Sequence, residues 1–183
     1  MDLPHAQPRD LSRLDPASPC VRGCLQVLER CETVLDALAA ARVPGAIERI
    51  GPHVRHILDH FSCLFSGLGR EYVDYDARAR NPRLEREPVV MRQAIGATKQ
   101  RLARLGQDGG ATPVAVHLRV CSDAAVTMAS TLDRELAFLS AHTVHHLSIM
   151  AQIARAHGID VDPAIELAFS TADYRQQLRR GSA

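Results

Sequence analysis

Residues 20–41 read CVRGCLQVLERCETVLDALAAA, and the spacing of their apolar side chains indicates the class of fold. Apolar residues recur at every third or fourth position: Val21, Cys24, Leu25, Leu28, Cys31, Leu35 and Leu38. This period places them on one face of an amphipathic α-helix. Ser18-Pro19 is typical of an N-cap followed by proline in the first turn, and Val43-Pro44-Gly45 ends the helix.

Three further stretches show the same period and predict helices over about residues 50–68, 85–105 and 131–157. We expect Gly51-Pro52 at the start of the first, because proline is tolerated there. The helix over about residues 85–105 is expected to end at Gly106 and Gly109-Gly110. The helix over about 131–157 is expected to be capped by Ser130, Thr131 or Asp133 and to end at Gly158.

These segments predict an all-α fold, a four-helix bundle of the up-down-down-up type with one longer crossover loop. Residues 69–83 are polar and are expected to form a loop. The alternating, β-branched residues 114–120, followed by a turn and by 126–128, predict a small β-hairpin before the last helix. The expected organisation is a flexible N-terminal arm (1–18), the bundle (19–160) and a C-terminal tail with a short helix (161–183).

The composition is that of an ordinary globular protein, with 46% hydrophobic and only 4% aromatic residues, so the core must be largely aliphatic. The formal net charge of +1 provides no field that favours nucleic acid or an anionic membrane. The five cysteines include no CxxC pair, and the N-terminus lacks a signal-peptide pattern. We therefore expect a soluble, cytoplasmic protein with reduced thiols.

Histidines provide the strongest functional signal, because six of the nine fall in two short windows inside expected helices. The windows contain His53, His56 and His60, and then His142, His145 and His146. Residues four apart lie on one helix face, so the pairs His56/His60 and His142/His146 can each converge on one ion. Imidazole nitrogens suit Zn²⁺, with Ni²⁺ or Fe²⁺ as alternatives, and three such ligands leave a position open for water or substrate.

The residues alone leave the choice among His53, His56 and His60 open. His145 lies about 100° around the helix from His146, so it is expected to turn away from the shared face. His145 is therefore expected to lie outside the ligand set, beside it or on the helix surface.

Two strings resemble the DinB-like superfamily: IGPHVRHILDH at residues 50–60 and RELAFLSAHTVHH at 134–146. The resemblance covers roughly residues 20–160 and implies a four-helix bundle, often homodimeric, with a three-histidine metal site. It implies His56, His142 and His146 as the ligands, with His53, His60 and His145 as outer-shell residues or alternative ligands. The superfamily includes thiol-dependent enzymes such as mycothiol-dependent maleylpyruvate isomerase and bacillithiol transferases, although the motifs here do not specify a thiol cofactor.

Three functional hypotheses follow. The first is a metal-dependent hydrolase or thiol-dependent transferase acting on a small molecule, with Asp59 or His60 as catalytic candidates and Tyr75 and Arg78 bordering the pocket. The second is a non-catalytic, stress-related bundle in which the metal stabilises the fold. The third is a helical interaction module without metal.

Overall fold

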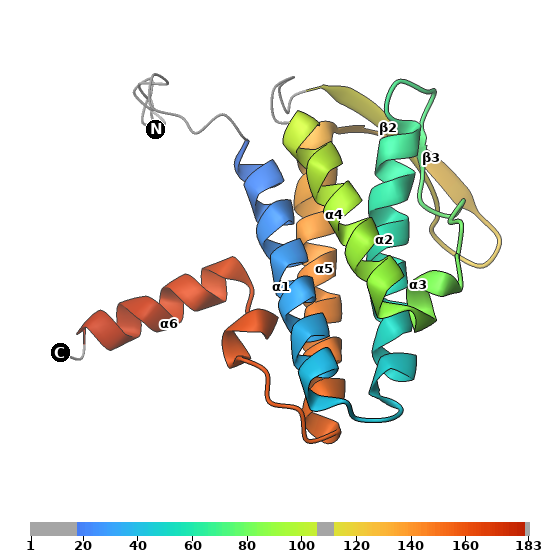
Figure 1. Ribbon diagram of the computed structural model, residues 1–183. Helices are drawn as coiled ribbons and strands as arrows, with labels where there is room; N and C mark the ends of the chain where they lie inside the picture. The colour runs from blue at the N-terminus through green and yellow to red at the C-terminus, as the bar shows by residue number, and fades with distance from the viewer. Residues whose placement is uncertain (1–17, 106–111, 182–183) are drawn as a thin grey trace.

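The computed structural model describes residues 18–105 and 112–181, and its core is helical (Figure 1). The long helices are α1 (Pro19–Ala41), α2 (Ala46–Gly67), α4 (Pro88–Leu105) and α5 (Leu132–Ala156). The shorter elements are β1 (Val73–Asp74), α3 (Arg83–Arg86), β2 (Pro113–Arg119), β3 (Ala125–Thr131), a 3-10 helix (Pro163–Glu166) and α6 (Phe169–Gly181). The expectation of a helical core is thus confirmed.

The four long helices lie side by side. In Figure 1, α1 and α5 run downward and α2 and α4 run upward, so the segment between α2 and α4 crosses back along the molecule. Helix α1 packs against α5 and α4, and α2 packs against the same two helices. The core between them is largely aliphatic, with fully buried Leu28, Ile57, Ile95 and Leu147 among its members.

Side-chain caps define the starts of two helices. The Ser18 hydroxyl accepts a hydrogen bond from the Val21 amide at 3.2 Å at the start of α1, as its sequence position predicted. The Thr131 hydroxyl does the same for the Arg134 amide at 3.3 Å at the start of α5. Three alternatives for the second cap were open from sequence, and the structure selects Thr131.

Helix α2 begins at Ala46, four residues earlier than expected, and Pro52 lies inside it. The expectation that Gly51-Pro52 starts this helix was therefore wrong. Gly51 lies where α3 packs closely: a Cβ atom at this position would be 1.8 Å from the Glu85 carbonyl oxygen. The glycine thus permits close approach of two backbones.

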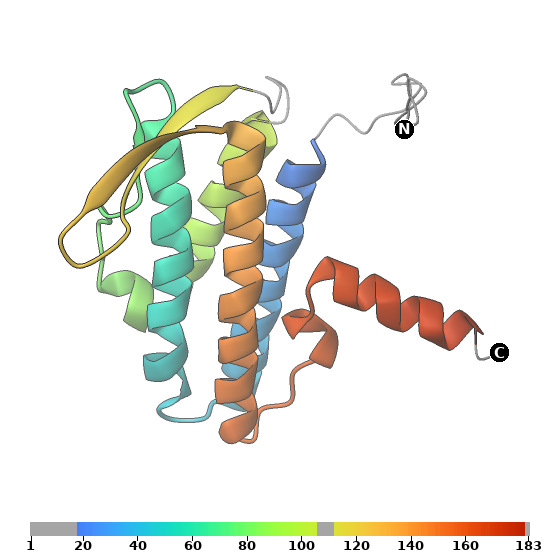
Figure 2. The ribbon, with the colours of Figure 1, turned by 180° about the vertical axis from the view of Figure 1, so that it is seen from behind.

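The expected hairpin is present as β2 and β3, which pair antiparallel, with His117 opposite Thr127. A third strand was not expected: β1, from the polar segment 69–83, pairs in parallel with β2 at Val73 and Val116. Val73 is fully buried, so this segment is anchored rather than a free loop. The sheet lies over one end of α2 and α5, as both ribbon views show (Figures 1 and 2).

Helix α6 extends away from the four long helices (Figure 2). Within the described part of the chain, no helix combines the length and the apolar character needed to cross a membrane. The predicted arm falls almost entirely on residues 1–17, and the glycines predicted to end α4 on 106–111, both outside the described residues.

Candidate metal centre

Helices α2 and α5 bring five imidazole rings together where the two helices pack. The helical spacing of three and four residues places His53, His56 and His60 along one side of α2, and His142 and His146 on the facing side of α5. Neighbouring ring centroids are 4.3 Å apart for His56–His60, 4.5 Å for His60–His142, 4.6 Å for His142–His146 and 4.7 Å for His56–His146. Histidines from two separate windows thus form one continuous cluster.

Three of these residues have donor atoms close enough to share an ion. One ligand atom each from His56, His60 and His142 lies within 4.8 Å of the other two. Nitrogens bound to one tetrahedral ion are about 3.4 Å apart, so modest side-chain rotations would close the set. The histidine cluster can therefore hold a metal ion.

Two of these rings have Nε2 atoms available for a ligand role. His60 Nδ1 lies 2.8 Å from the His56 carbonyl oxygen, which can only accept, so Nδ1 carries the proton and the Nε2 lone pair is free. His142 Nε2 is buried and has no hydrogen-bond partner. A buried nitrogen without a partner is costly, and coordination to a cation would satisfy it. The residues present therefore fit a divalent transition metal.

His146 lies beside this trio rather than within it. Its Nδ1 is 3.0 Å from His53 Nδ1, so one of these two nitrogens carries a proton and the other accepts it. The Nε2 atom of His146 is then the one left for a ligand role. His145 is exposed on α5 and contacts only the edge of the cluster, through the His146 ring at 5.1 Å.

Burial and crowding keep the imidazoles neutral. The pKa of His56 is lowered to about 3, first by burial and then by the neighbouring rings and Arg78. The same causes lower the pKa of His142 to about 4, and burial with the adjacent histidines lowers that of His146 to about 3. Neutral imidazoles retain the lone pairs that metal ligands need.

The other sequence candidates have distinct surroundings. Asp59 is buried, but its carboxylate pairs with Arg55 at 3.1 Å rather than with a histidine. Tyr75 is buried, with its ring stacked on His60 at 5.7 Å. Arg78 reaches the cluster directly, with Nη1 3.2 Å from His56 Nδ1.

Two residues around the cluster were not singled out from the sequence. The Phe138 ring stacks on His142 at 5.6 Å, and its position four residues earlier on α5 was an available signal. Glu135 is buried and accepts hydrogen bonds from Tyr75 Oη at 2.9 Å and from Ser130 Oγ at 2.5 Å. The Tyr75–Glu135 hydrogen bond forms because β1 places Tyr75 beside α5. No local pattern in the sequence indicates this position of Tyr75.

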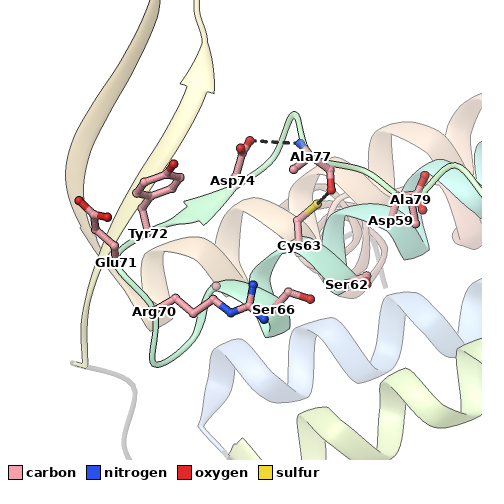
Figure 3. A pocket seen from close by; sticks show the side chains of 11 residues that line it. Asp59, Ser62, Cys63, Ser66, Arg70, Glu71, Tyr72, Asp74, Ala77 and Ala79 are labelled. Atoms are coloured by element: carbon pink, nitrogen blue, oxygen red, sulfur yellow. Dashed lines mark hydrogen bonds between the residues drawn. The ribbon is translucent and has the colours of Figure 1, made fainter.

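Two hollows flank this region. A mainly apolar one of about 470 Å³ lies between the sheet and α5, and Tyr75 and Phe138 form part of its wall. A polar one of about 540 Å³ lies along α2 and the segment after it (Figure 3). No histidine lines the polar hollow, although Asp59 and Cys63 do. Of these two hollows, the apolar one is lined by rings that contact the cluster.

Fold and site together define a helical protein with a small three-stranded sheet and a histidine cluster suited to a metal ion. No family model, no curated protein and no solved structure matches this chain.

Proposed function

We propose that this chain is a divalent-metal-dependent enzyme of the DinB-like superfamily, with a four-helix bundle of the up-down-down-up type. The observation that supports this proposal is the convergence of His56, His60 and His142 from α2 and α5, with donor atoms within 4.8 Å of one another. A bundle interior is where facing helices deliver ligands to a shared site. Zn²⁺ is the first choice, with Ni²⁺ and Fe²⁺ as alternatives.

The reaction we propose is hydrolysis or thiol-dependent group transfer on a small molecule. A divalent ion held by these residues supplies Lewis acidity, which lowers the pKa of a water or thiol beside it and stabilises developing negative charge. Tyr75 and Phe138 exclude water from one side of the cluster and border the apolar hollow. The His53–His146 pair holds a proton between two Nδ1 atoms at the edge of the cluster.

A second candidate function is a purely stabilising metal site. His146 favours this alternative, because its ring lies within 4.7 Å of both His56 and His142, measured between centroids. If its Nε2 joined the other three ligands, the site would be closed by four protein atoms and would have no open position.

Cobalt substitution separates the two functions. If the metal has an open position, azide should change the visible spectrum of the Co²⁺-loaded protein. The Zn²⁺-loaded protein should then catalyse ester hydrolysis or thiol transfer, and chelation should abolish this activity. His142→Ala should abolish both signals, whereas the exposed His145→Ala should retain them. A spectrum insensitive to azide, together with no activity above that of the chelated protein, would instead support the stabilising role.

A homodimer, which the resemblance implies, is also proposed. Light scattering on the purified chain tests it directly, since a molar mass equal to that of one chain would reject it.

A further inference from the structure

The side chain of Arg78 occupies an unusual position for a cation. It comes from the segment after β1 and directs Nη1 to His56 Nδ1 at 3.2 Å, while its buried Nε has no hydrogen-bond partner. Among residues 18–105 and 112–181, no carboxylate lies within ion-pair distance of Arg78. A guanidinium thus faces the candidate metal ligands without an ion-pair partner among these residues, although the carboxylates of Asp59 and Asp76 also act on the His60 ring.

The Arg78–His56 hydrogen bond and metal coordination by His56 exclude each other. A guanidinium only donates, so His56 Nδ1 accepts and the neutral ring carries its proton on Nε2. A metal bound at Nδ1 would displace Arg78. A metal bound at Nε2 would require the proton to move to Nδ1, where it would oppose the Arg78 N–H. In both cases Arg78 has to leave His56.

Electrostatic repulsion by Arg78 also opposes metal binding at the histidine cluster. Burial is the largest cause that lowers the pKa of His56, His60 and His142, and the charge of Arg78 lowers the pKa of each of them further. Like charges in a half-buried site repel more strongly than in water. A divalent ion held by the same three imidazoles is therefore disfavoured until Arg78 moves away or is neutralised.

An anion provides that neutralisation. The planar fork of a guanidinium matches the two oxygens of a carboxylate or the oxygens of a phosphate, and such bonds are among the stronger hydrogen bonds in proteins. An apolar hollow borders the same cluster, because Tyr75 and Phe138, which line it, contact His60 and His142. This hollow is the room that we assign to an apolar group attached to that anion.

We propose that Arg78 couples metal loading to the binding of an organic oxyanion, a carboxylate or phosphate on an apolar body. Arg78 competes with the metal for His56 until the oxyanion binds its guanidinium, and the metal and the oxyanion then promote each other's binding. This reciprocity is required by linkage. The inference rests on the proposed metal function and names the class of ligand that it serves.

The test is the Zn²⁺ affinity of tag-free protein, measured by competition with a chromophoric chelator, with and without benzoate. For the wild type we expect benzoate to raise Zn²⁺ affinity about tenfold. Arg78→Met should bind Zn²⁺ about tenfold more tightly than wild type without benzoate, and benzoate should add nothing. Arg78→Lys, which keeps the charge, should bind no more tightly than wild type. Arg80 is an exposed arginine in the same segment, and Arg80→Met should behave as wild type.

Two other anions in place of benzoate define the ligand. Acetate, which lacks the ring, tests whether the apolar group is needed. Phenylphosphonate, which keeps the ring, tests whether a phosphate-like group can replace the carboxylate.

The outcomes separate this inference from the function on which it rests. If neither the wild type nor Arg78→Met binds Zn²⁺, the metal function itself fails. If both bind Zn²⁺ equally, or if the wild-type affinity is the same with every anion, the metal function stands and the coupling is overturned. Weaker binding by a folded Arg78→Met, checked by circular dichroism, would also overturn it.

Discussion

Which ring nitrogen carries the proton determines which atom of each histidine in the cluster can bind a metal. His60 donates from Nδ1 to a carbonyl oxygen, and this bond both orients its ring and leaves Nε2 unprotonated. His142 Nε2 is buried without a partner. These two atoms, on different helices, are the best prepared ligands in the structure.

Removing one of these ligands should empty the site. We expect His142→Ala to weaken Zn²⁺ binding by about 100-fold or more, because loss of even an outer partner costs about 10- to 100-fold. Isothermal titration calorimetry measures the effect. The matched control is His145→Ala, three residues along the same helix and exposed, which should bind as wild type. If His145→Ala were the variant that lost the metal, the assignment of helix faces would be wrong.

The depressed histidine pKa values predict acid sensitivity of the metal-free protein. The folded-state pKa is about 3 for His56 and His146 and about 4 for His142, below the ordinary value of 6.5. Between about pH 4 and pH 6.5 the unfolded chain binds more protons than the folded one. The free energy of unfolding should therefore fall as the pH drops from about 6.5 toward 4. Above about pH 7 these groups should contribute no pH dependence.

Urea midpoints of chelator-treated protein at pH 7.5 and pH 5 test this prediction. The midpoint should be lower at pH 5, and His56→Gln should reduce the difference. A midpoint that rises on acidification would contradict the neutral-imidazole description.

The location of the site was readable from the sequence, but its ligand set was not. Clustering and helical spacing were enough to predict that the two histidine windows meet. The structure groups His60 with His56 and His142 and places His146 beside them. That difference depends on the rotations of individual side chains, which spacing cannot specify. The assignment of His56, His142 and His146 as the ligands therefore stays a prediction.

At the scale of the elements, the contact between α2 and α3 depends on Gly51. A methyl group there would be 1.8 Å from the Glu85 carbonyl oxygen, so the backbone must shift. We expect Gly51→Ala to destabilise the fold by about 1–3 kcal/mol, the usual cost of overpacking. Urea unfolding provides the measurement.

Gly96→Ala is the control for this effect, because Gly96 lies inside α4 and a Cβ atom added to it would meet no atom within 4 Å. The substitution should be neutral or stabilise the protein by up to about 1 kcal/mol, since alanine favours helix more than glycine does. Equal effects of the two substitutions would show that α3 does not pack as described.

Elements with long apolar periods were predictable, and elements defined by distant contacts were not. Helix α1 and the β2–β3 hairpin follow from local pattern alone. Strand β1 is two residues long and exists because Val73 is buried opposite Val116, which is far away along the chain. The early start of α2 was missed because proline usually marks a helix start, whereas here Pro52 is tolerated within the helix.

For the whole molecule, an ion at the cluster would connect α2 to α5. These helices also carry the sheet that positions Tyr75, so metal loading should stabilise the packed body and not only the site. Binding free energy adds to folding free energy when the unfolded chain offers no formed site. Zn²⁺ should therefore raise the melting temperature of wild-type protein but not that of His142→Ala.

The decisive measurement is the metal content of tag-free protein after exposure to Zn²⁺, Ni²⁺ or Fe²⁺ and removal of excess, combined with X-ray absorption at the metal edge. We expect about one ion per chain, with imidazole nitrogens at about 2.0–2.1 Å in the case of zinc. Less than about a tenth of an equivalent with every metal would contradict the proposed site, because imidazoles that share an ion should retain it.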